Sequence, residues 1–482
     1  MANRFVACDI GASNTRYLSN NGNISVLPNN MEFIKADTRI DLEPNSNEIE
    51  SALDVTIECD NGCTFFPVRV LVGQLANRHS ATNVRPTILQ NKSAQQINYV
   101  SAVIATALSS YKYGQAEEID LYLALPPIEV KASKDLVRNN LIGSYVVTFH
   151  KLNNTRIKFK IRDVHIYEES FLAIFSYFFN MDGSVRETAE QYARGSILSL
   201  DIGASTTDLA IVKDMQFLEK SGQTYKTGGN VARDFLANYI RGSSGYDVTD
   251  EVAEEAIAEG RIQYGNEYLD CSEAVSQAKA ELAKQIVVQM QSYFRMVGIP
   301  MQTIRAIVVS GGGSMEGFYT DDNGETHHTS NPISDYITNE LSRICSGIAV
   351  ERFTENPRMA NIMGLFIRAN IDAHRRKQAE LQAQTQSGQY MQQDSTVQNT
   401  VDNQSQVEQN IVTQQPFNGV VVQPINQQMQ AQQMQAEMQA QQMQAMQGQM
   451  QSIGNPQIQP MQGQMQPIQG MASNVNGQLM GN

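Results

Sequence analysis

Two short stretches, DIGASNTR at Asp9–Arg16 and DIGASTTD at Asp201–Asp208, carry residue types that hold an anion. Glycine lets a backbone approach a ligand closely, and successive backbone N–H groups in a turn form an anion-binding nest. Hydroxyl and amide side chains at both tips add hydrogen-bond donors, and the guanidinium of Arg16 can bond to phosphate oxygens. We therefore expect each stretch to bind a phosphate group.

The aspartates that open the two stretches require a cation in the site. A carboxylate at Asp9 or Asp201 would repel a phosphate, so both make sense only with a cation between them and the anion. Mg²⁺ bound largely through water, with the carboxylates around it, meets that condition. Asp201 can instead orient the attacking water as a catalytic residue, and Asp208 can help to position that water or simply cap the turn. Asp9 and Asp201 can also be read as turn-capping residues.

The surrounding sequence predicts a β-hairpin at each stretch. The pentapeptide Asp-Ile-Gly-Ala-Ser occurs twice, each time after an apolar run (FVAC or SILSL) and before a second candidate strand (TRYLS or DLAIV). Two ordinary turns are the simple reading, and a duplicated phosphate clamp is the specific one. A Walker A loop is excluded because the chain has no Gly-Lys dipeptide. A dinucleotide fingerprint is disfavoured because Glu316 stands where its third glycine belongs.

Composition limits the remaining classes of function. The 482 residues, 41% of them hydrophobic, suffice for about two to four domains. A formal charge of −14 argues against nucleic-acid binding through a basic surface. Five scattered cysteines suit a reducing compartment. We find no signal peptide and no apolar run of about twenty residues, so we expect a cytoplasmic protein with no membrane contact.

The composition changes near residue 379. Residues 379–482 are rich in Gln and Met, and no lysine or arginine follows Lys377. Such a segment has few groups that could build a packed core, so we expect a disordered tail. The alternative is a helix, transient or induced by a partner, with a methionine stripe along one side. That stripe would comprise Met429, Met434, Met438, Met443, Met446 and Met450.

Taken together, the two Asp-x-Gly hairpins and the later VVSGGG segment (Val308–Gly313) resemble the actin superfamily. In that resemblance, DIGASNTR is the first phosphate loop, DIGASTTD the second, and Gly311–Ser314 the adenosine-binding turn. The chain is most similar to ParM-type plasmid-segregation actins, through Asn14 and Arg16, a Glu-Ser pair at Glu169-Ser170, and PRMANIMGLF at Pro357–Phe366. That family has proline before the pair, whereas Glu168 stands there in this chain and is a rival catalytic candidate.

The resemblance implies roles for individual residues. Glu169 would polarise the attacking water; the rival interpretation, which is compatible, is a glutamate in the first turn of an amphipathic helix. Gly228, Gly229 and Arg233 would lie close to the nucleotide; otherwise they form a helix entry with a solvated Arg233–Asp234 pair. Lys279 or Lys284 could face the base or ribose, but a solvated lysine is favoured. The predicted nucleotide-binding residues are Asp9, Gly11, Ala12, Ser13, Asn14, Thr15, Arg16, Gly203, Ala204, Ser205, Thr206, Thr207, Gly228, Gly229, Arg233, Gly311, Gly312, Gly313 and Ser314.

The resemblance also implies an architecture and a function. We expect an α/β fold of two halves, residues 1–190 and 191–353, with 354–378 packing back onto the first and nucleotide in the cleft between them. The function would be ATP or GTP hydrolysis with Mg²⁺, coupled to assembly of the chain with itself into filaments that segregate plasmid DNA through an adaptor protein. A small-molecule kinase and a chaperone-type ATPase of the same superfamily are the alternatives.

Overall fold

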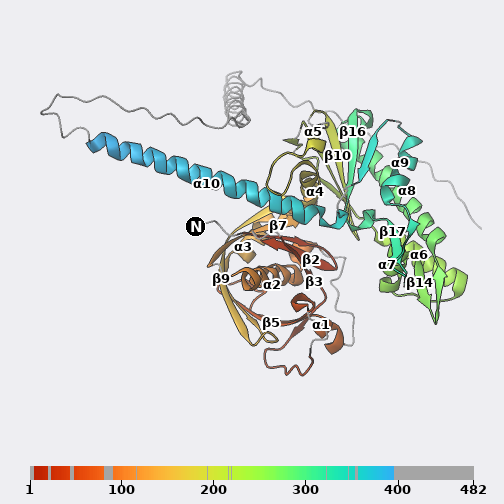
Figure 1. Cartoon of the computed structure of the whole chain (residues 1–482), viewed down its shortest axis with the longest axis horizontal. Helices are drawn as coiled ribbons and strands as arrows, with labels where there is room; N and C mark the ends of the chain where they lie inside the picture. The colour runs from red at the N-terminus through yellow and green to blue at the C-terminus, as the bar shows by residue number, and fades with distance from the viewer. Residues whose placement is uncertain are drawn as a thin grey trace, which may run out of the picture. The chain divides into compact units, whose positions relative to one another are not determined.

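The computed structural model describes residues 5–19, 23–43, 48–80, 91–114, 117–190, 192, 194–214, 216–218, 220–321, 323–345, 347–352 and 356–395. Residues 1–398 form one compact unit and residues 399–482 another. All described residues belong to the first unit, so the predicted methionine stripe lies outside them. Figure 1 traces the chain with its elements labelled.

The first half of the chain is built on a mixed sheet. Its described strands run in the spatial order β3-β2-β1-β7-β9-β8-β5-β6-β4. The strands are β1 (Phe5–Ile10), β2 (Asn14–Ser19), β3 (Ile24–Pro28), β4 (Met31–Ile34), β5 (Ala52–Cys59), β6 (Val68–Gly73), β7 (Glu118–Leu125), β8 (Gly143–Phe149) and β9 (Thr155–Glu168). β7 is parallel to both β1 and β9, whereas the hairpin β1–β2 is antiparallel.

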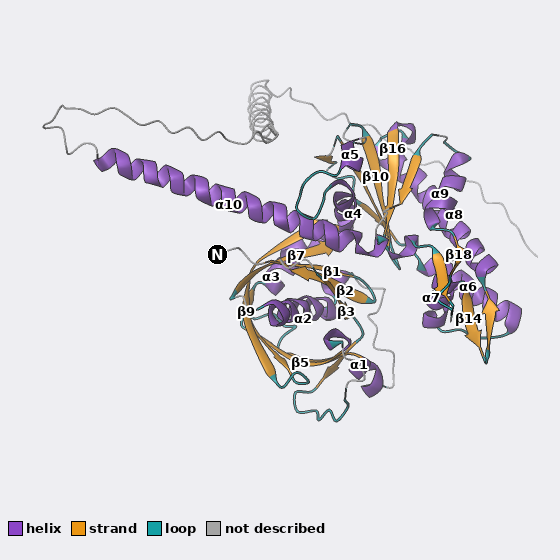
Figure 2. Cartoon of the chain, viewed as in Figure 1, coloured by secondary structure: helices purple, strands orange, loops and turns teal. Residues whose placement is uncertain are grey.

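Helix α2 (Gln96–Tyr113) lies inside the curve of this sheet, as Figure 2 shows. Its sequence is small and apolar on all sides, which is the pattern of a helix buried all round. Val6, Cys8 and Ile10 of β1 point toward this core. Helix α3 (Pro127–Leu141) follows β7 and packs on β9. The short elements of this half are α1 (Gln74–His79), η1 (Ile49–Ser51) and η2 (Lys92–Ala94).

The second sheet has the described strand order β12-β11-β10-β16-β19, with β13 also pairing with β11. The strands are β10 (Ser196–Ile202), β11 (Thr207–Lys213), β12 (Gln216–Phe217), β13 (Gln223–Tyr225), β16 (Ile304–Ser310) and β19 (Ala349–Arg352). Leu198, Leu200 and Ile202 share a core with the helix α8 (Ser272–Val297). β10 and β16 are parallel, so their carboxyl ends, at Asp201 and Ser310, lie side by side.

The other elements flank this sheet or form small hairpins. They are α5 (Glu187–Glu190), α6 (Asn230–Ser244), α7 (Asp250–Glu259), β14 (Arg261–Tyr264), β15 (Glu267–Asp270), η3 (Met301–Thr303), η4 (Gly312–Ser314), β17 (Gly317–Thr320), β18 (Thr326–Ser330), α9 (Ile333–Ser342) and η5 (Pro357–Met359). Two sheets covered by helices confirm the predicted α/β class.

Helices α4 (Glu169–Phe178) and α10 (Ala360–Ser395) connect the sheets. Leu172 of α4 packs in the core that β1 shares with α10, while Ile174 and Phe178 pack against β10, β11 and β16. Gly364 permits the close approach of α10 to α4, because a Cβ there would lie 2.0 Å from the carbonyl oxygen of Leu172. The start of α10 thus packs on β1 and α4, and the predicted domain boundaries stay a prediction.

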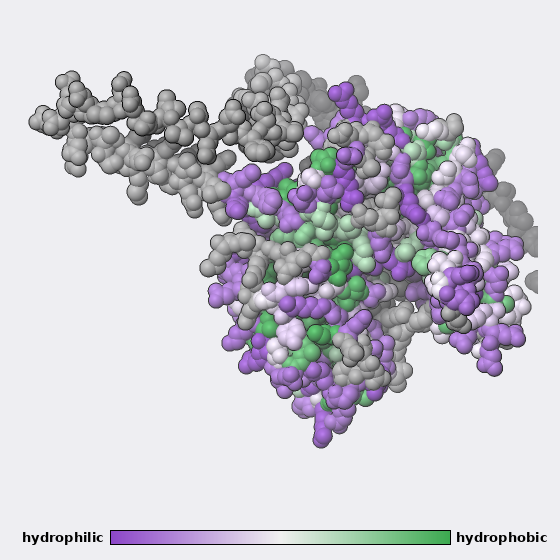
Figure 3. All heavy atoms as spheres, in the orientation of Figure 1, coloured by the Kyte–Doolittle hydropathy of each residue, from purple (hydrophilic) through white to green (hydrophobic). Residues whose placement is uncertain are grey.

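The last described helix extends beyond the predicted start of the tail. α10 continues through 379–395, where Ala, Gln and Met are adequate helix formers, and residues 396–482 lie outside the described residues. In the part of the chain that the structure describes, no helix combines the length and apolarity that crossing a bilayer requires. On the face drawn in Figure 3, hydrophilic side chains predominate and apolar ones occur in small groups.

Candidate functional site

Both predicted hairpins are present, and their tips have the same hydrogen bond. Gly11 N donates to Asn14 O at 2.9 Å in the first hairpin, and Gly203 N donates to Thr206 O at 2.8 Å in the second. The strand registers also correspond, because Ile10 pairs with Thr15 and Ile202 with Thr207. The repeated sequence therefore folds into a repeated structure.

Each tip is supported by an asparagine from outside the repeat. The side chain of Asn29 is fully buried; its Nδ2 donates to Gly11 O at 2.6 Å, and its Oδ1 accepts from Thr15 Oγ1 at 2.8 Å. At the second tip, Asn230 donates from its backbone N to Ala204 O at 2.7 Å and from Nδ2 to Ser205 Oγ at 3.3 Å. These contacts fix the backbone of both tips, while Ala12, Ser13 and Ala204 are exposed and Asn14, Ser205 and Thr206 are partly exposed.

Gly228 and Gly229 lie against the second tip. Gly229 N donates to Gly203 O at 2.9 Å, and a Cβ on Gly228 would lie 2.7 Å from the carbonyl oxygens of Gly203 and Ala204. Both glycines therefore lie against the second tip, and their predicted closeness to the nucleotide stays a prediction. The guanidinium of Arg233 contacts Asp234, Asp250 and Glu254; its own side chain is largely buried, whereas the side chain of Asp234 is exposed.

The glycine-rich turn packs on the same tip. Gly311 has φ of 87°, and a Cβ there would meet Ile202 O at 2.3 Å and Asp201 Oδ1 at 2.5 Å. Gly313 is held as closely against Ile202, and the buried Ser314 Oγ donates to Gly311 O at 2.7 Å. The glycine turn at Gly311–Ser314 and the second tip therefore lie in contact.

Four carboxylates converge below the two tips. Asp9, Glu169, Asp201 and Asp208 are each about 2–6% exposed, and one oxygen each of Glu169, Asp201 and Asp208 lie within 4.8 Å of one another. Asp201 accepts from Asn361 Nδ2 at 2.8 Å and from Ser310 Oγ at 3.3 Å. Thr224 Oγ1 donates to Asp208 at 2.6 Å. The structure thus brings together every acidic residue that the sequence singled out, with Glu168 as the exception.

Glu168 points away from this cluster. It is the last residue of β9, and its Oε2 lies where a Cβ of Gly222 would be, beside Pro127. Glu169, the first residue of α4, points into the cluster instead. Adjacent residues diverge in this way because the chain passes from strand to helix between them.

Burial and mutual repulsion raise the pKa values of three of these carboxylates, those of Glu169, Asp201 and Asp208. Burial is the main cause for Glu169, whose pKa rises to about 8; Lys92 opposes the rise, and Asp208 and Asp9 add to it. Burial raises the pKa of Asp208 to about 7, against hydrogen bonds from Thr224, and it also raises the pKa of Asp201. Carboxylates that titrate near neutral pH mark a site short of positive charge.

Lys92 supplies positive charge to the cluster, and the sequence analysis missed it. Its Nζ forms a hydrogen-bonded ion pair with Glu169, and despite burial its pKa is raised by Glu169 and Asp9. Glu129 of α3 holds the turn that carries it, since its carboxylate accepts from the backbone N of Lys92 at 2.9 Å and of Ser93 at 2.7 Å. No motif surrounds Lys92, so only the fold reveals its place.

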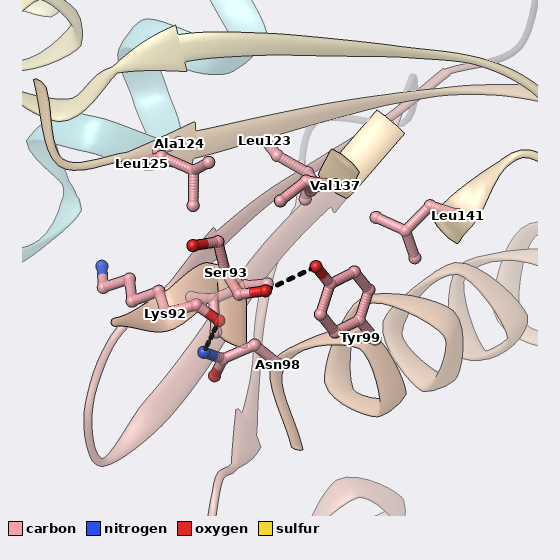
Figure 4. Close-up of a pocket in the computed structure, with 10 residues that line it drawn as sticks. Lys92, Ser93, Asn98, Tyr99, Leu123, Ala124, Leu125, Val137 and Leu141 are labelled. Atoms are coloured by element: carbon pink, nitrogen blue, oxygen red, sulfur yellow. Dashed lines mark hydrogen bonds between the residues drawn. The ribbon is translucent and has the colours of Figure 1, made fainter. Parts of the chain in front are cut away.

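Lys92 also lies at the edge of a small pocket with a volume of about 20 Å³, enough for one water molecule. Leu123, Leu125, Val137 and Leu141 line it, and the Tyr99 hydroxyl donates to Ser93 O at 2.6 Å. In Figure 4 the ammonium end of Lys92 points away from Tyr99 and Leu141. Apolar side chains thus line the space on the side of Lys92 away from its ion pair with Glu169.

The donor set fits a hard divalent cation. Mg²⁺ prefers carboxylate oxygens and retains several waters. Glu169, Asp201 and Asp208 offer such oxygens within 4.8 Å of one another, and the negative charge of the buried Asp9 acts on Glu169. The residues present therefore fit a magnesium ion, and the magnesium site stays a prediction.

The two lysines on α8 differ from each other. Lys279 is 3% exposed and donates to Met315 O, Ser330 Oγ and Asn331 O at 2.7–3.1 Å. The interpretation of a solvated lysine is wrong here, because the helix directs this side chain inward between two loops. Lys284 is exposed, as expected, and lies 4.0 Å from Glu281.

Two family models of actin-like proteins match this chain. Residues 7–171 match the family model "Actin like proteins N terminal domain", and residues 199–316 match "Archaeal actin homologue MreB-like, C-terminal". The search of curated proteins gave no match.

Three solved structures, among many that match, illustrate the similarity of fold. The actin-like protein Alp7A is 18% identical with a TM-score of 0.58, over 78% of this chain and 98% of its own. A 15-stranded ParM filament from Clostridium botulinum is 17% identical in sequence with a TM-score of 0.54, and the match covers 77% of this chain and 100% of its own. Ta0583, an archaeal actin homologue in complex with ADP, is 18% identical in sequence with a TM-score of 0.52, and the match covers 76% of this chain and 98% of its own.

Proposed function

This chain belongs to the actin superfamily, and we propose that it is an actin-like ATPase that binds a nucleotide between its two Asp-x-Gly hairpins and polymerises. The observation that carries the proposal is the convergence of two structurally equivalent tips over one buried carboxylate cluster. Exposed tip residues would hold the phosphates, and the glycine turn at Gly311–Ser314 would hold the adenosine. The ADP complex of Ta0583 supports a nucleotide ligand in this fold.

Asp9, Asp201 and Asp208 would hold the Mg²⁺ ion, mainly through water. When bound, the ion neutralises the carboxylates and the phosphate oxygens together. It would thus supply the positive charge that Lys92 alone does not. Asp201 is kept in orientation by Asn361 and Ser310, and Asp208 by Thr224.

Glu169 is the residue that we assign to the attacking water. Phosphoryl transfer depends on positioning and charge stabilisation, so one carboxylate near the terminal phosphate suffices. Its ion pair with Lys92 fixes its direction, and Lys92 opposes the rise of its pKa. Glu168 is a poor candidate, because its carboxylate lies beside Pro127 and Gly222.

Filament formation and its use extend this proposal. The ParM filament supports self-association for a chain of this fold, and hydrolysis after assembly would release the clamp between the hairpins. We assign the filament to the segregation of plasmid DNA in the cytoplasm. The net charge of −14 favours a DNA-binding adaptor protein over direct contact with DNA.

Light scattering and negative-stain microscopy after addition of Mg-ATP or Mg-GTP, with release of phosphate followed in parallel, test the proposal. We expect filaments that need nucleotide, and loss of hydrolysis in Asp201→Ala and Glu169→Ala. Hydrolysis that survives both substitutions would refute the site. ADP production stimulated by a sugar, without scattering, would favour a small-molecule kinase instead.

A further inference from the structure

Arg358 belongs to a segment that is fastened to the glycine turn. Gly311 N donates to Pro357 O at 3.1 Å, and Asn361 donates to Asp201. Asn356 caps the short helix η5 by accepting from Arg358 N at 3.0 Å. A Cβ on Gly312 would lie 3.6 Å from both Cγ and Nε of Arg358. The arginine side chain therefore extends along the glycine turn from a fixed backbone position.

Arg16 occupies the corresponding place on the first hairpin. A Cβ on Gly11 would lie 3.6 Å from its Nη1, so the guanidinium folds over the tip. Its contact with Asp9 is 3.7 Å, which is longer than a hydrogen bond, and its Nε is buried with no hydrogen-bond partner. Arg16 therefore carries one buried donor, Nε, that no described group satisfies.

The two guanidinium groups influence each other. Burial and then the positive charge of Arg16 lower the pKa of Arg358, and Glu254 only partly opposes them. Among the residues that the structure describes, no hydrogen bond or ion pair engages the Arg358 guanidinium. Arg358 is exposed and Arg16 is only partly buried, so an anion that reaches both guanidinium groups would gain two charge-assisted contacts.

We propose that Arg358 and Arg16 bind the phosphate chain of the nucleotide from two sides, Arg16 from the first hairpin and Arg358 from the short helix η5 that precedes α10. The inference rests on the proposed function and adds a specificity-determining residue to it. A phosphate chain is favoured over a base as the ligand of Arg358 because only an anion relieves the repulsion between two guanidinium groups. Arginine also presents several donors in a planar fork that matches phosphate oxygens.

This arrangement makes affinity depend on the number of phosphates. Each phosphate adds negative charge between the arginines, so both bind ADP and ATP more strongly than adenosine. Without nucleotide, the same two groups repel each other, and removal of either charge relieves that repulsion. Arg358→Gln is therefore expected to weaken nucleotide binding without lowering the melting temperature of the nucleotide-free protein.

The test uses the full chain and competition against a fluorescent ADP analogue in Mg²⁺ buffer. Dissociation constants for adenosine, AMP, ADP and ATP are measured for the wild type, Arg358→Gln, Arg358→Lys and Arg16→Gln. Arg375→Gln is the matched control, because Arg375 is an exposed arginine on α10, the helix that follows η5. A charge-assisted contact predicts that Arg358→Gln weakens ADP and ATP about tenfold to hundredfold. Adenosine and the control should be unchanged, and Arg358→Lys should recover part of the loss.

Several outcomes would overturn the inference. ADP affinity unchanged in Arg358→Gln would remove Arg358 from the phosphate site. An equal loss for adenosine would place Arg358 against the base. A lower melting temperature of the nucleotide-free variant would show a structural role. A wild-type chain that binds no nucleotide would defeat the proposed function itself, which separates that failure from a failure of Arg358 alone.

Discussion

Asn361, at the start of α10, donates from its Nδ2 to Oδ2 of Asp201 at 2.8 Å, across 160 positions of sequence. Asp201 is 5% exposed, and this bond is the largest factor that opposes the rise of its pKa on burial. The C-terminal helix therefore takes part in keeping the second hairpin's aspartate ionised. A contact of this kind couples the packing of α10 to the charge of the site.

Replacement of Asn361 by alanine should therefore lower the rate of Mg-ATP hydrolysis. A hydrogen bond to a charged group contributes enough to predict a loss of about tenfold or more. The control is Asn370→Ala on the same helix, because Asn370 donates to Met181 O at 3.0 Å and contacts no carboxylate of the cluster. Phosphate release is the measurement, and equal rates in wild type and Asn361→Ala would contradict the role of this bond.

Adjacent glutamates provide the next test. Glu169→Gln keeps the size of the side chain but removes the carboxylate that faces the cluster, so hydrolysis should fall about 10²- to 10⁴-fold. Glu168→Gln is the matched control and should retain hydrolysis, because its carboxylate lies beside Gly222. Single-turnover hydrolysis together with ADP affinity separates chemistry from binding. If Glu168→Gln were the inactive variant, the two assignments would have to be exchanged.

The hairpins could be predicted from sequence because they are local. Each tip joins two strands that are adjacent in the chain, and the repeated pentapeptide with apolar flanks determines both the turn and the register. Lys92, Asn29 and Asn361 could not be predicted in this way. Their positions depend on how separate elements pack, and Lys92 is 77 positions from its partner Glu169. Lys279 was misread for a similar reason, because helical periodicity does not show which polar loops will enclose a lysine.

The carboxylate cluster should make the nucleotide-free protein less stable as pH rises. Asp208 and Glu169 titrate near 7 and 8 in the folded protein but near 3.8 and 4.5 when unperturbed. The folded state therefore binds more protons between these values, and the stabilisation present below about pH 4 is lost as pH rises through 7 to 8. Lys92, whose pKa is also raised, loses its proton only above this window.

Asp208→Asn isolates this effect, because asparagine has the same shape and no charge to desolvate. We expect its melting temperature to exceed that of the wild type at pH 8 by about 2–4 °C for each kcal/mol relieved, and to differ little at pH 4. Thermal unfolding without nucleotide, recorded from pH 4 to 8.5, measures it. A stability difference that is constant across this range would show that Asp208 is not protonated on folding.

The contact between α10 and α4 can be tested with two glycines. Gly364 has no space for a side chain, since a Cβ would lie 2.0 Å from the carbonyl oxygen and 2.7 Å from the carbonyl carbon of Leu172. Gly364→Ala should therefore force the helices apart and lower the free energy of unfolding by about 1–3 kcal/mol. Gly242, within α6, has no atom within 4 Å of a Cβ, so Gly242→Ala should instead raise it by about 0.5–1 kcal/mol. Denaturant unfolding measures both changes in the free energy of unfolding. Because α10 also carries Asn361, Gly364→Ala should reduce hydrolysis as well. Full activity in that destabilised variant would show that the Asn361–Asp201 hydrogen bond does not depend on this helix contact.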